Sequence, residues 1–259
     1  MKARKERNLI DQQEHRRIKL VTEYRGTRYA GWQYQDNAPT VQAALEKALS
    51  ELLKRPVKLI GCSRTDAGVH ALNHVSHFNG ACPVPLDKLP LALIPFLPAD
   101  IAVKEAQEVD EDFHARFSAK GKSYFYQIWN MPYRSALLSP YSYHEPRHLD
   151  LEAMKEACPY VIGTHDLAGC MATGSQAKTT VRTIYDLHIE IPQDGLIQIR
   201  IHGDAFLYNM VRIIAGTLLY VGLGKIEVFE IEAIIASKDR KKAGKTLEAK
   251  GLFLERVYY

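Results

Sequence analysis

The segment of residues 122–130 constrains the fold most, because it carries large side chains on both of its faces. Successive side chains of a β-strand point to opposite faces of the sheet. In this segment one face carries Tyr124 and Tyr126, and the other carries Phe125 and Trp129. The pattern predicts a central strand that is covered on each side.

The rest of the chain divides into two halves that each run strand, helix, strand, helix, strand. Ile18 and Leu20 alternate with other residues as in a strand, and Thr40 is placed to cap a helix that stops before Pro56. We expect strands at residues 18–24, 57–62, 73–79, from 101, 122–130, 181–191, 196–203 and 251–259. We expect helices at residues 41–52, 86–94, 149–160, 206–221 (with Asp204 as the N-cap) and 228–237.

This order of elements predicts an α+β fold whose two halves join their sheets edge to edge. The junction of two such halves is a natural cleft for a ligand. We expect a flexible basic tail at residues 1–17, an N-terminal α+β half at 18–120 and a C-terminal α+β half at 121–259. The tail has no apolar stripe, so a solvated segment is favoured over a basic arm that contacts RNA phosphates.

Composition and charge narrow the class of protein only a little. The 259 residues are 46% hydrophobic and 25% charged, as in a globular protein with a sizeable core. A formal net charge of +4 permits a polyanionic partner without requiring one. The sequence has neither the apolar run of a membrane span nor the apolar segment of a secretory signal. Its four cysteines are spaced too irregularly for a zinc site or a disulfide framework, so we expect a cytoplasmic protein.

The most specific local feature is the segment Cys-Ser-Arg-Thr-Asp-Ala-Gly-Val-His at residues 62–70. It places Asp66 on an expected turn after a buried strand, with Gly68 available for a left-handed backbone conformation. In an extended backbone Arg64 lies on the same side as Asp66 and can keep the carboxylate ionised, as a nucleophile requires. From the spacing alone, an Asx-turn with a structural ion pair is the favoured interpretation.

Three histidines follow closely and raise a second possibility. On a helix, His70, His74 and His77 would share a face with Asp66 and could bind zinc or iron. Gly68 and the neighbouring asparagines oppose a helix, and on a strand His74 and His77 point to opposite faces. We therefore expect no metal site.

Two residues of the second half are candidates for binding a nucleotide or a charge. Tyr124 can stack a splayed RNA base, although most aromatic residues of strands are core residues. Arg212 lies within an apolar helix, where a guanidinium is costly unless it is paired, and a carboxylate in the cleft is the expected partner. Basic residues that would contact phosphates if they share a face are Lys178, Arg182, Lys238, Arg240, Lys241, Lys242 and Lys245.

Taken together, these segments resemble the bacterial tRNA pseudouridine synthase A family from residue 19 to residue 259. The motifs that carry the resemblance stand in the family's order: YRGTRYAGWQYQ near the start, SRTDAGVHA at 63–71, DFHARFSAKGKSYFY at 112–126, KTTVRTI at 178–184, DAFLYNMVRIIAGTL at 204–218 and KGLFLERVYY at the end. Departures are modest. Ser63 stands where many members have glycine, and His-Asp-Leu at 165–167 replaces the commoner His-Asp-Phe.

The resemblance implies two ferredoxin-like halves that form one extended, mostly antiparallel sheet with a central basic cleft. It implies a homodimer that converts uridines at nucleotides 38, 39 and 40 of the tRNA anticodon stem-loop without metal or organic cofactor. By the same resemblance Asp66 is the catalytic aspartate, Tyr124 stacks the substrate base, and Arg212 pairs with the aspartate. Arg64 would enter the RNA stem as the target base leaves it, and Lys178 and Arg182 would bind substrate.

The expected reaction begins when a uridine flips out of its stack into the cleft. Asp66 then promotes cleavage of the glycosidic bond by attacking C1′ of the sugar or C6 of the base, or by assisting loss of the C2′ proton. Tyr124 is a candidate acceptor for the C5 proton. Two rival interpretations are a metal-dependent hydrolase, using Asp66 and the three histidines, and an RNA-binding protein without catalysis.

Overall fold

The computed structural model describes residues 16–174 and 177–259, and the chain forms two compact units. Unit 1 comprises the described residues up to Lys120 together with Val257–Tyr259, and unit 2 comprises Gly121–Arg256. Nearly all of the tail expected at residues 1–17 lies outside the described residues.

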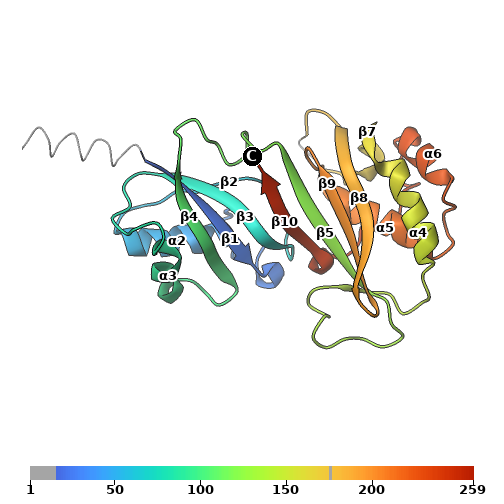
Figure 1. The fold of residues 1–259 in the computed structure, drawn as a ribbon, viewed down its shortest axis with the longest axis horizontal. Coiled ribbons are helices and arrows are strands. Elements are labelled where there is room, and N and C mark those ends of the chain that lie inside the picture. Colours follow the sequence, from blue (N-terminus) through green and yellow to red (C-terminus); the bar gives the residue numbers. More distant parts are fainter. Residues whose placement is uncertain (1–15, 175–176) are drawn as a thin grey trace, which may run out of the picture. The chain divides into compact units, whose positions relative to one another are not determined.

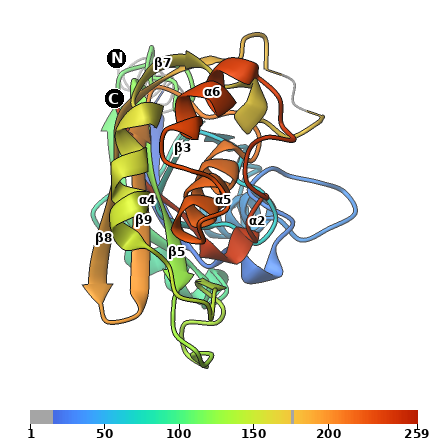
Figure 2. The same cartoon turned by 90° about the vertical axis from the view of Figure 1, so that its right-hand side faces the viewer.

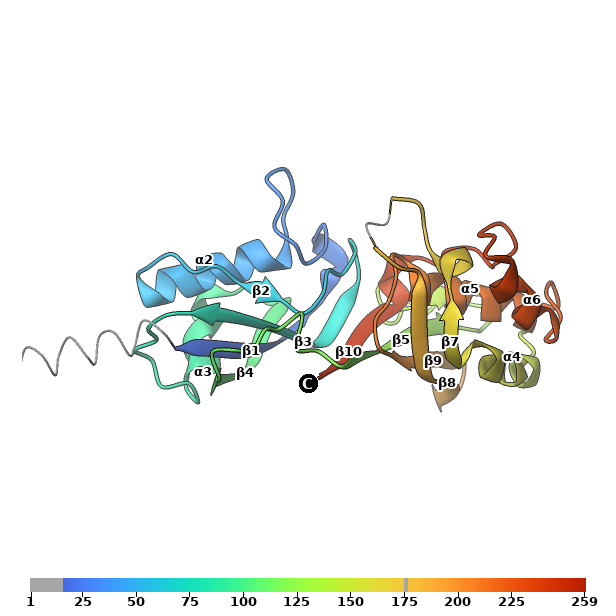
Figure 3. The ribbon, with the colours of Figure 1, turned by 90° about the horizontal axis from the view of Figure 1, so that it is seen from above.

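Unit 1 contains an antiparallel sheet in the strand order β4-β1-β3, with helices packed against it (Figure 1). The alternation expected at residues 18–24 is confirmed, because Ile18 and Leu20 are fully buried while the residues between them are not. Figure 3 shows α2 running along one face of this sheet. The elements are β1 (Arg17–Tyr24), η1 (Gly26–Arg28), α2 (Val41–Leu53), β2 (Ile60–Gly61), β3 (His70–Asn79), α3 (Leu89–Leu93), η2 (Ile94–Phe96) and β4 (Ile101–Val109).

Local capping explains where α2 begins and ends. The hydroxyl oxygen of Thr40 accepts a hydrogen bond from the backbone N–H of Ala43 at 3.3 Å, which confirms the expected N-cap. Lys54 closes the helix in a left-handed conformation with φ 56°, and Pro56 follows it. The strand expected at residues 57–62 is shorter than predicted, since only Ile60 and Gly61 pair with β3.

The strands of unit 2 follow the order β10-β5-β9-β8-β7. The pairs β5–β9, β9–β8 and β8–β7 are antiparallel, and β6 pairs with β5 in parallel. Helix α5 lies against one face of the sheet (Figure 2). The elements are β5 (Gly121–Trp129), β6 (Tyr143–His144), α4 (Leu151–Ala157), η3 (Cys158–Val161), β7 (Gly163–Asp166), η4 (Ala168–Cys170), β8 (Val181–Gln193), β9 (Leu196–Gly203), α5 (Met210–Gly222), α6 (Glu230–Ser237), η5 (Ala249–Gly251) and β10 (Leu252–Tyr258).

The expectation that residues 122–130 form a central strand is confirmed. Strand β5 lies between β9 and β10, and Tyr126 and Phe125, on opposite faces, are both buried. Phe125 is covered by side chains of the neighbouring strands, because Phe253 stacks on its ring at 4.7 Å and the Arg200 guanidinium lies 5.3 Å from the ring centroid. Unit 2 also confirms the expected hairpin, in which Asp194 and Gly195 (φ 74°) connect β8 to β9.

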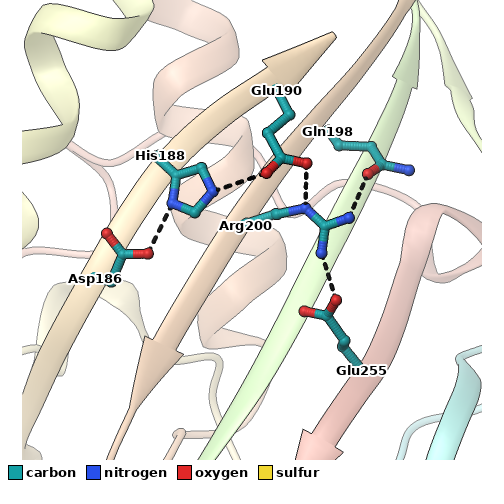
Figure 4. A network of polar contacts seen from close by, with 6 residues as sticks. All are labelled: Asp186, His188, Glu190, Gln198, Arg200 and Glu255. Atoms are coloured by element: carbon teal, nitrogen blue, oxygen red, sulfur yellow. Dashed lines mark hydrogen bonds and ion pairs between the residues drawn. The ribbon is translucent and has the colours of Figure 1, made fainter. Parts of the chain in front are cut away.

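A chain of charges crosses the exposed side of β8 and β9 (Figure 4). The imidazole of His188 lies between the carboxylates of Asp186 and Glu190, at 2.7 and 3.2 Å. Arg200 donates to Glu190 at 2.6 Å and also to Glu255, and its hydrogen bond to Glu190 lowers the pKa of that carboxylate. On this face of unit 2 the Arg200–Glu190 pair joins the neighbouring strands β9 and β8, and the Arg200–Glu255 pair reaches across β5 to β10.

The start of α5 differs from the expectation. Asp204 does not cap the helix, because its carboxylate accepts hydrogen bonds from the backbone N–H groups of Thr183 and Ala205. The helix begins at Met210, after Asn209 has adopted a left-handed conformation with φ 61°. The helix expected at 149–160 is also shorter, since α4 passes into a 3₁₀ turn that contains Pro159.

The expected α+β class with mostly antiparallel strands is confirmed in both units. Within the part of the chain that the structure describes, the helices are too short or too polar to cross a membrane.

Helix α5 allows a test of how tightly unit 2 is packed. A Cβ atom added to Gly216 would lie 1.9 Å from the carbonyl oxygen of Lys245, so the helix or the loop would have to move. We expect Gly216→Ala to lower the free energy of unfolding by at least about 2 kcal/mol, measured by urea denaturation. Gly224→Ala is the control, with no atom within 4 Å and φ 64°, and should cost about 1 kcal/mol. Equal losses in the two variants would contradict the close approach.

Candidate active site

Asp66 lies at the first position of a tight turn in unit 1. The backbone N–H of Val69 donates to the carbonyl oxygen of Asp66 at 3.1 Å, and Gly68 has φ 81°. A positive φ at the third position of a turn favours glycine, so the predicted left-handed glycine is confirmed. Asp66 is partly exposed and Arg64 is exposed, while Thr65 between them is buried. Asp66 therefore remains partly accessible to solvent on this turn.

A loop with two glycines, residues 25–32, packs against the back of this turn. A Cβ atom on Gly26 would lie 1.9 Å from the carbonyl oxygen of Val69, and one on Gly31 would lie 2.3 Å from that of Thr65. Gly31 also has φ 101°, a conformation that side chains rarely adopt. We call residues 25–32 the glycine loop; its backbone sets the position of the Asp66 turn.

Hydrogen bonds join the glycine loop to the turn. The carbonyl oxygen of Thr65 accepts a hydrogen bond from the backbone N–H of Trp32 at 3.1 Å, and the backbone N–H of Gly68 donates to the carbonyl oxygen of Tyr29 at 3.3 Å. The Thr65 hydroxyl pairs with the Tyr24 hydroxyl at 2.8 Å in a buried contact. Each bond is between atoms of the main chain or buried side chains, so the turn has little freedom to move.

The glycine loop is itself held in place by Asp100. Its buried carboxylate accepts hydrogen bonds from Arg28 and from the Tyr29 hydroxyl, both at 2.7 Å. Burial alone raises the pKa of Asp100, but the hydrogen bonds from Tyr29 and Arg28 outweigh it, and the pKa is lowered. Burial and the bond to Asp100 raise the pKa of Tyr29. Asp100 was not identified from the sequence, because its partners lie about 70 residues away.

The three histidines of β3 each have a different partner. His70 accepts a hydrogen bond from the N–H of Gly26 at 3.0 Å, and His74 stacks on Trp32 with ring centroids 3.6 Å apart. His77 accepts from the N–H of Ala115 at 3.2 Å. Among the described residues, His, Cys, Asp and Glu side chains form no group of three that could hold a metal ion. The histidines are thus used for packing and for backbone hydrogen bonds.

In unit 2, Tyr124 lies on β5 and its ring is held by Phe206. The two ring centroids are 5.0 Å apart in an edge-to-face arrangement, and Tyr124 is 7% exposed. Tyr126, two residues along the strand, has a structural role, because its hydroxyl donates to the carbonyl oxygen of Glu248 at 2.7 Å. Strand alternation places both tyrosines on one face and does not distinguish them, and only the family resemblance singled out Tyr124.

Arg212 lies in the first turn of α5 and is held by two acceptors of unit 2. Its Nε–H donates to the carbonyl oxygen of Leu247 at 2.7 Å, and its Nη1 donates to the Asn209 side chain. A guanidinium is planar and carries its N–H donors in a fixed arrangement, so these bonds set its orientation. The left-handed conformation of Asn209, with φ 61°, places its amide at the start of the helix.

Of the basic residues that the sequence suggested as phosphate contacts, some have hydrogen-bond or ion-pair partners within the protein and others are exposed. Lys238 pairs with Asp166 at 2.7 Å, and Arg240 donates to the carbonyl oxygen of Gly244 at 2.8 Å. Lys245 donates to the Tyr143 hydroxyl and lies 4.4 Å from the centroid of its ring. Lys178, Lys241 and Lys242 are exposed, and Arg182 is partly exposed with a buried Nε that has no partner among the described residues.

The sequence of the chain matches a known protein family. A family model described as tRNA pseudouridine synthase matches residues 20–118 and 157–259. The tRNA pseudouridine synthase A of Ruminiclostridium cellulolyticum is 50% identical over 244 residues, which cover 94% of this chain and 100% of the relative. That of Acetivibrio thermocellus is 52% identical over the same coverage. Among solved structures, the archaeal box H/ACA sRNP Nop10-Cbf5 complex contains a chain with 10% identity and a TM-score of 0.35, covering 92% of this chain and 61% of that one.

The glycine loop can be tested through its effect on catalysis. A side chain at Gly31 must displace the Thr65 carbonyl and with it the Asp66 turn, and a displacement of about 1 Å can cost about 10²-fold in rate. We expect Gly31→Ala to lower kcat/KM for tRNA modification by at least about that factor. Gly80→Ala is the control, since Gly80 has a similar φ of 114° but faces the flexible side chain of Arg55. Similar activity in the two variants would contradict the role of the loop.

His77 predicts a pH dependence of stability. Burial, with the nearby charge of Arg17, lowers the pKa of His77 to about 4. In the unfolded chain the His77 imidazole binds a proton near pH 6.5, whereas in the folded protein it stays neutral down to about pH 4. The free energy of unfolding is therefore not reduced by this group above pH 6.5, and it decreases by up to roughly 3 kcal/mol as the pH falls towards 4.

We expect His77→Gln to flatten this part of the curve, measured by denaturant midpoints between pH 7 and pH 4. Glutamine keeps an acceptor for the Ala115 N–H, so the backbone hydrogen bond is preserved. Parallel curves for the two proteins would show that His77 is not the titrating group.

Proposed function

The chain belongs to the tRNA pseudouridine synthase family, and from this premise we propose that it isomerises uridines at nucleotides 38, 39 and 40 of the tRNA anticodon stem-loop. As a member of the family it is an isomerase that acts on tRNA. The observation that carries the proposal is the near-complete alignment with tRNA pseudouridine synthase A, at 50% identity over 100% of the relative. The SRTDAGVHA motif falls within it.

We assign the catalytic roles to Asp66, Tyr124 and Arg212. A nucleophilic carboxylate must be ionised and rigidly placed, and the turn braced by Gly26 and Gly31 supports that role for Asp66. The orientation of Arg212, held by the carbonyl oxygen of Leu247, supports its role as the cation that pairs with Asp66.

The proposed reaction starts with a flipped uridine, at a cost of a few kcal/mol that stacking on Tyr124 and phosphate contacts offset. Asp66 promotes cleavage of the bond between N1 and C1′, by attack at C1′ or C6 or by assisting loss of the C2′ proton. The uracil then rotates within the pocket and C5 bonds to C1′. Tyr124 accepts the C5 proton and passes it to solvent, and N1 of the uracil takes up a proton from solvent. The product therefore has the same composition as the substrate, and no energy source is needed.

Binding of the RNA is assigned to basic residues around the catalytic group. The exposed side chain of Arg64, two residues before Asp66, supports the proposal that it occupies the space the flipped base leaves in the stem. Lys178 and Arg182 are proposed to contact phosphates, where a cation releases counterions from the RNA. We further propose that the protein acts as a homodimer in the cytoplasm and uses no cofactor.

The catalytic assignment is tested by Asp66→Asn, which keeps the shape of the side chain and removes its charge. We expect tritium release from tRNA labelled at C5 of uridine to fall by at least about 10³-fold, with the Kd for tRNA within about threefold of wild type. Asp87→Asn, at an exposed aspartate paired only with its neighbour Lys88, is the matched control.

Release from Asp66→Asn equal to that of the wild type would refute the assignment. Binding of tRNA without release from either protein would favour an RNA-binding protein without catalysis. Transcripts with a single uridine at position 38, 39 or 40 test the proposed specificity, because modification elsewhere would contradict it.

A further inference from the structure

An exposed phenylalanine lies in a part of unit 1 that the proposed catalysis does not use. Phe117, in the motif Phe-His-Ala-Arg-Phe-Ser-Ala, is 75% exposed. Isolated exposed apolar residues are common, so exposure alone indicates little. Two further observations, the rigidity of its backbone and the chemistry of its neighbours, give this residue a role.

The backbone around Phe117 is a closed turn. The N–H of His114 donates to the Ser118 hydroxyl and the N–H of Ser118 donates to the carbonyl oxygen of His114, each at 2.9 Å. The Nδ1 atom of His114 also accepts from the N–H groups of Arg116 and Phe117, at 3.1 and 3.2 Å. An exposed aromatic side chain on such a turn loses little backbone entropy when it binds a partner.

Contacts with the rest of unit 1 anchor this turn. The hydroxyl of Tyr259 donates to the carbonyl oxygen of Ala115 at 2.7 Å, and the N–H of Ala115 donates to His77. Arg17 donates to the carbonyl oxygen of Phe113 at 2.7 Å. The turn is therefore part of the rigid structure of the unit.

The side chains around the Phe117 ring have the composition of a nucleotide site. The imidazole of His114 stacks on the ring, with centroids 4.4 Å apart and planes at 29°. The guanidinium of Arg116 lies 5.6 Å from the ring centroid and is itself exposed. A flat aromatic surface beside a cation matches a base and its phosphate, because the base stacks and the phosphate pairs with the guanidinium.

We propose that Phe117, His114 and Arg116 form a second stacking site, which holds an unpaired nucleotide of the tRNA away from the reacting uridine. The base stacks on the open part of the Phe117 ring, and Arg116 pairs with its phosphate. Because the occupant is part of the same tRNA, this site rests on the proposed function. A nucleotide fits better than a protein partner, because Phe117 is the only exposed large apolar side chain of residues 110–120 and the exposed Arg116 directly precedes it. The exposed carboxylates of this stretch, Asp110, Glu111 and Asp112, lie five or more residues from Phe117 in sequence.

The site is tested by the affinity of Phe117→Ala for a tRNA transcript at fixed salt. Loss of one stacked base raises the Kd about 5- to 100-fold, while Phe117→Trp, which keeps a stacking surface, stays within about threefold of wild type. The value of kcat at saturating tRNA is unchanged, because the ring does not contact the reacting base. Arg116→Ala reduces the salt dependence of log Kd by about one unit of slope.

Phe229→Ala is the matched control. Phe229 is 72% exposed but is surrounded in sequence by the exposed Glu227, Glu230 and Glu232, which repel phosphates, so its loss leaves the Kd unchanged. An unchanged Kd for Phe117→Ala would overturn the proposal. A shift of Phe117→Ala to a smaller species in sedimentation equilibrium would also overturn it, by identifying a contact between two copies of the chain.

Separate measurements test the proposed reaction and the proposed stacking site, so one can be rejected while the other is kept. Tritium release measures the reaction, whereas the Kd of Phe117→Ala measures the stacking site. A wild-type protein that releases no tritium but loses tRNA affinity on Phe117→Ala would retain the stacking site and reject the proposed reaction.

Discussion

The close approach of the glycine loop to the Asp66 turn is the contact on which the candidate site depends. At Gly26 and Gly31 the two stretches of backbone are so near that a methyl group on either residue would collide with a carbonyl oxygen. The position of the Asp66 backbone is therefore set by main-chain contacts. Asp100 extends this support, because it ties Arg28 and Tyr29 of the same loop to the start of β4. Such a site favours the proposed reaction, because the backbone that carries the proposed catalytic carboxylate is in place before the substrate arrives.

Unit 2 uses a similar device for the proposed partner of Asp66. Gly216 of α5 lies against the carbonyl oxygen of Lys245, and Gly244 lies equally close to the backbone of Gly216. These contacts hold the loop that supplies the Leu247 carbonyl, which orients Arg212. In both units a glycine allows one backbone to touch another, and the second backbone carries or orients a charged group. Within each unit, close backbone packing thus helps to set the position of the proposed catalytic residue.

Features that depend on neighbours in sequence could be predicted. The N-cap at Thr40, the left-handed Gly68 and the Asp-Gly hairpin before β9 each follow from the preferences of one or two residues. The start of α5 could not be predicted in this way. Asp204 is a good N-cap residue by type, but its carboxylate binds the Thr183 N–H on β8, and the helix begins six residues later. A tertiary hydrogen bond overrode the local preference.

The sequence by itself determined the family, the α+β class and the identity of the proposed chemical groups, because these are carried by residue types in a fixed order. Only the tertiary structure decided what the other conspicuous residues do. It assigned His70, His74 and His77 to three separate partners, Tyr126 to the Glu248 carbonyl, and Asn209 to Arg212. The physical reason is that a hydrogen bond or a ring contact is satisfied by whichever group the fold brings within about 3 to 4 Å, and spacing along the chain does not specify that group.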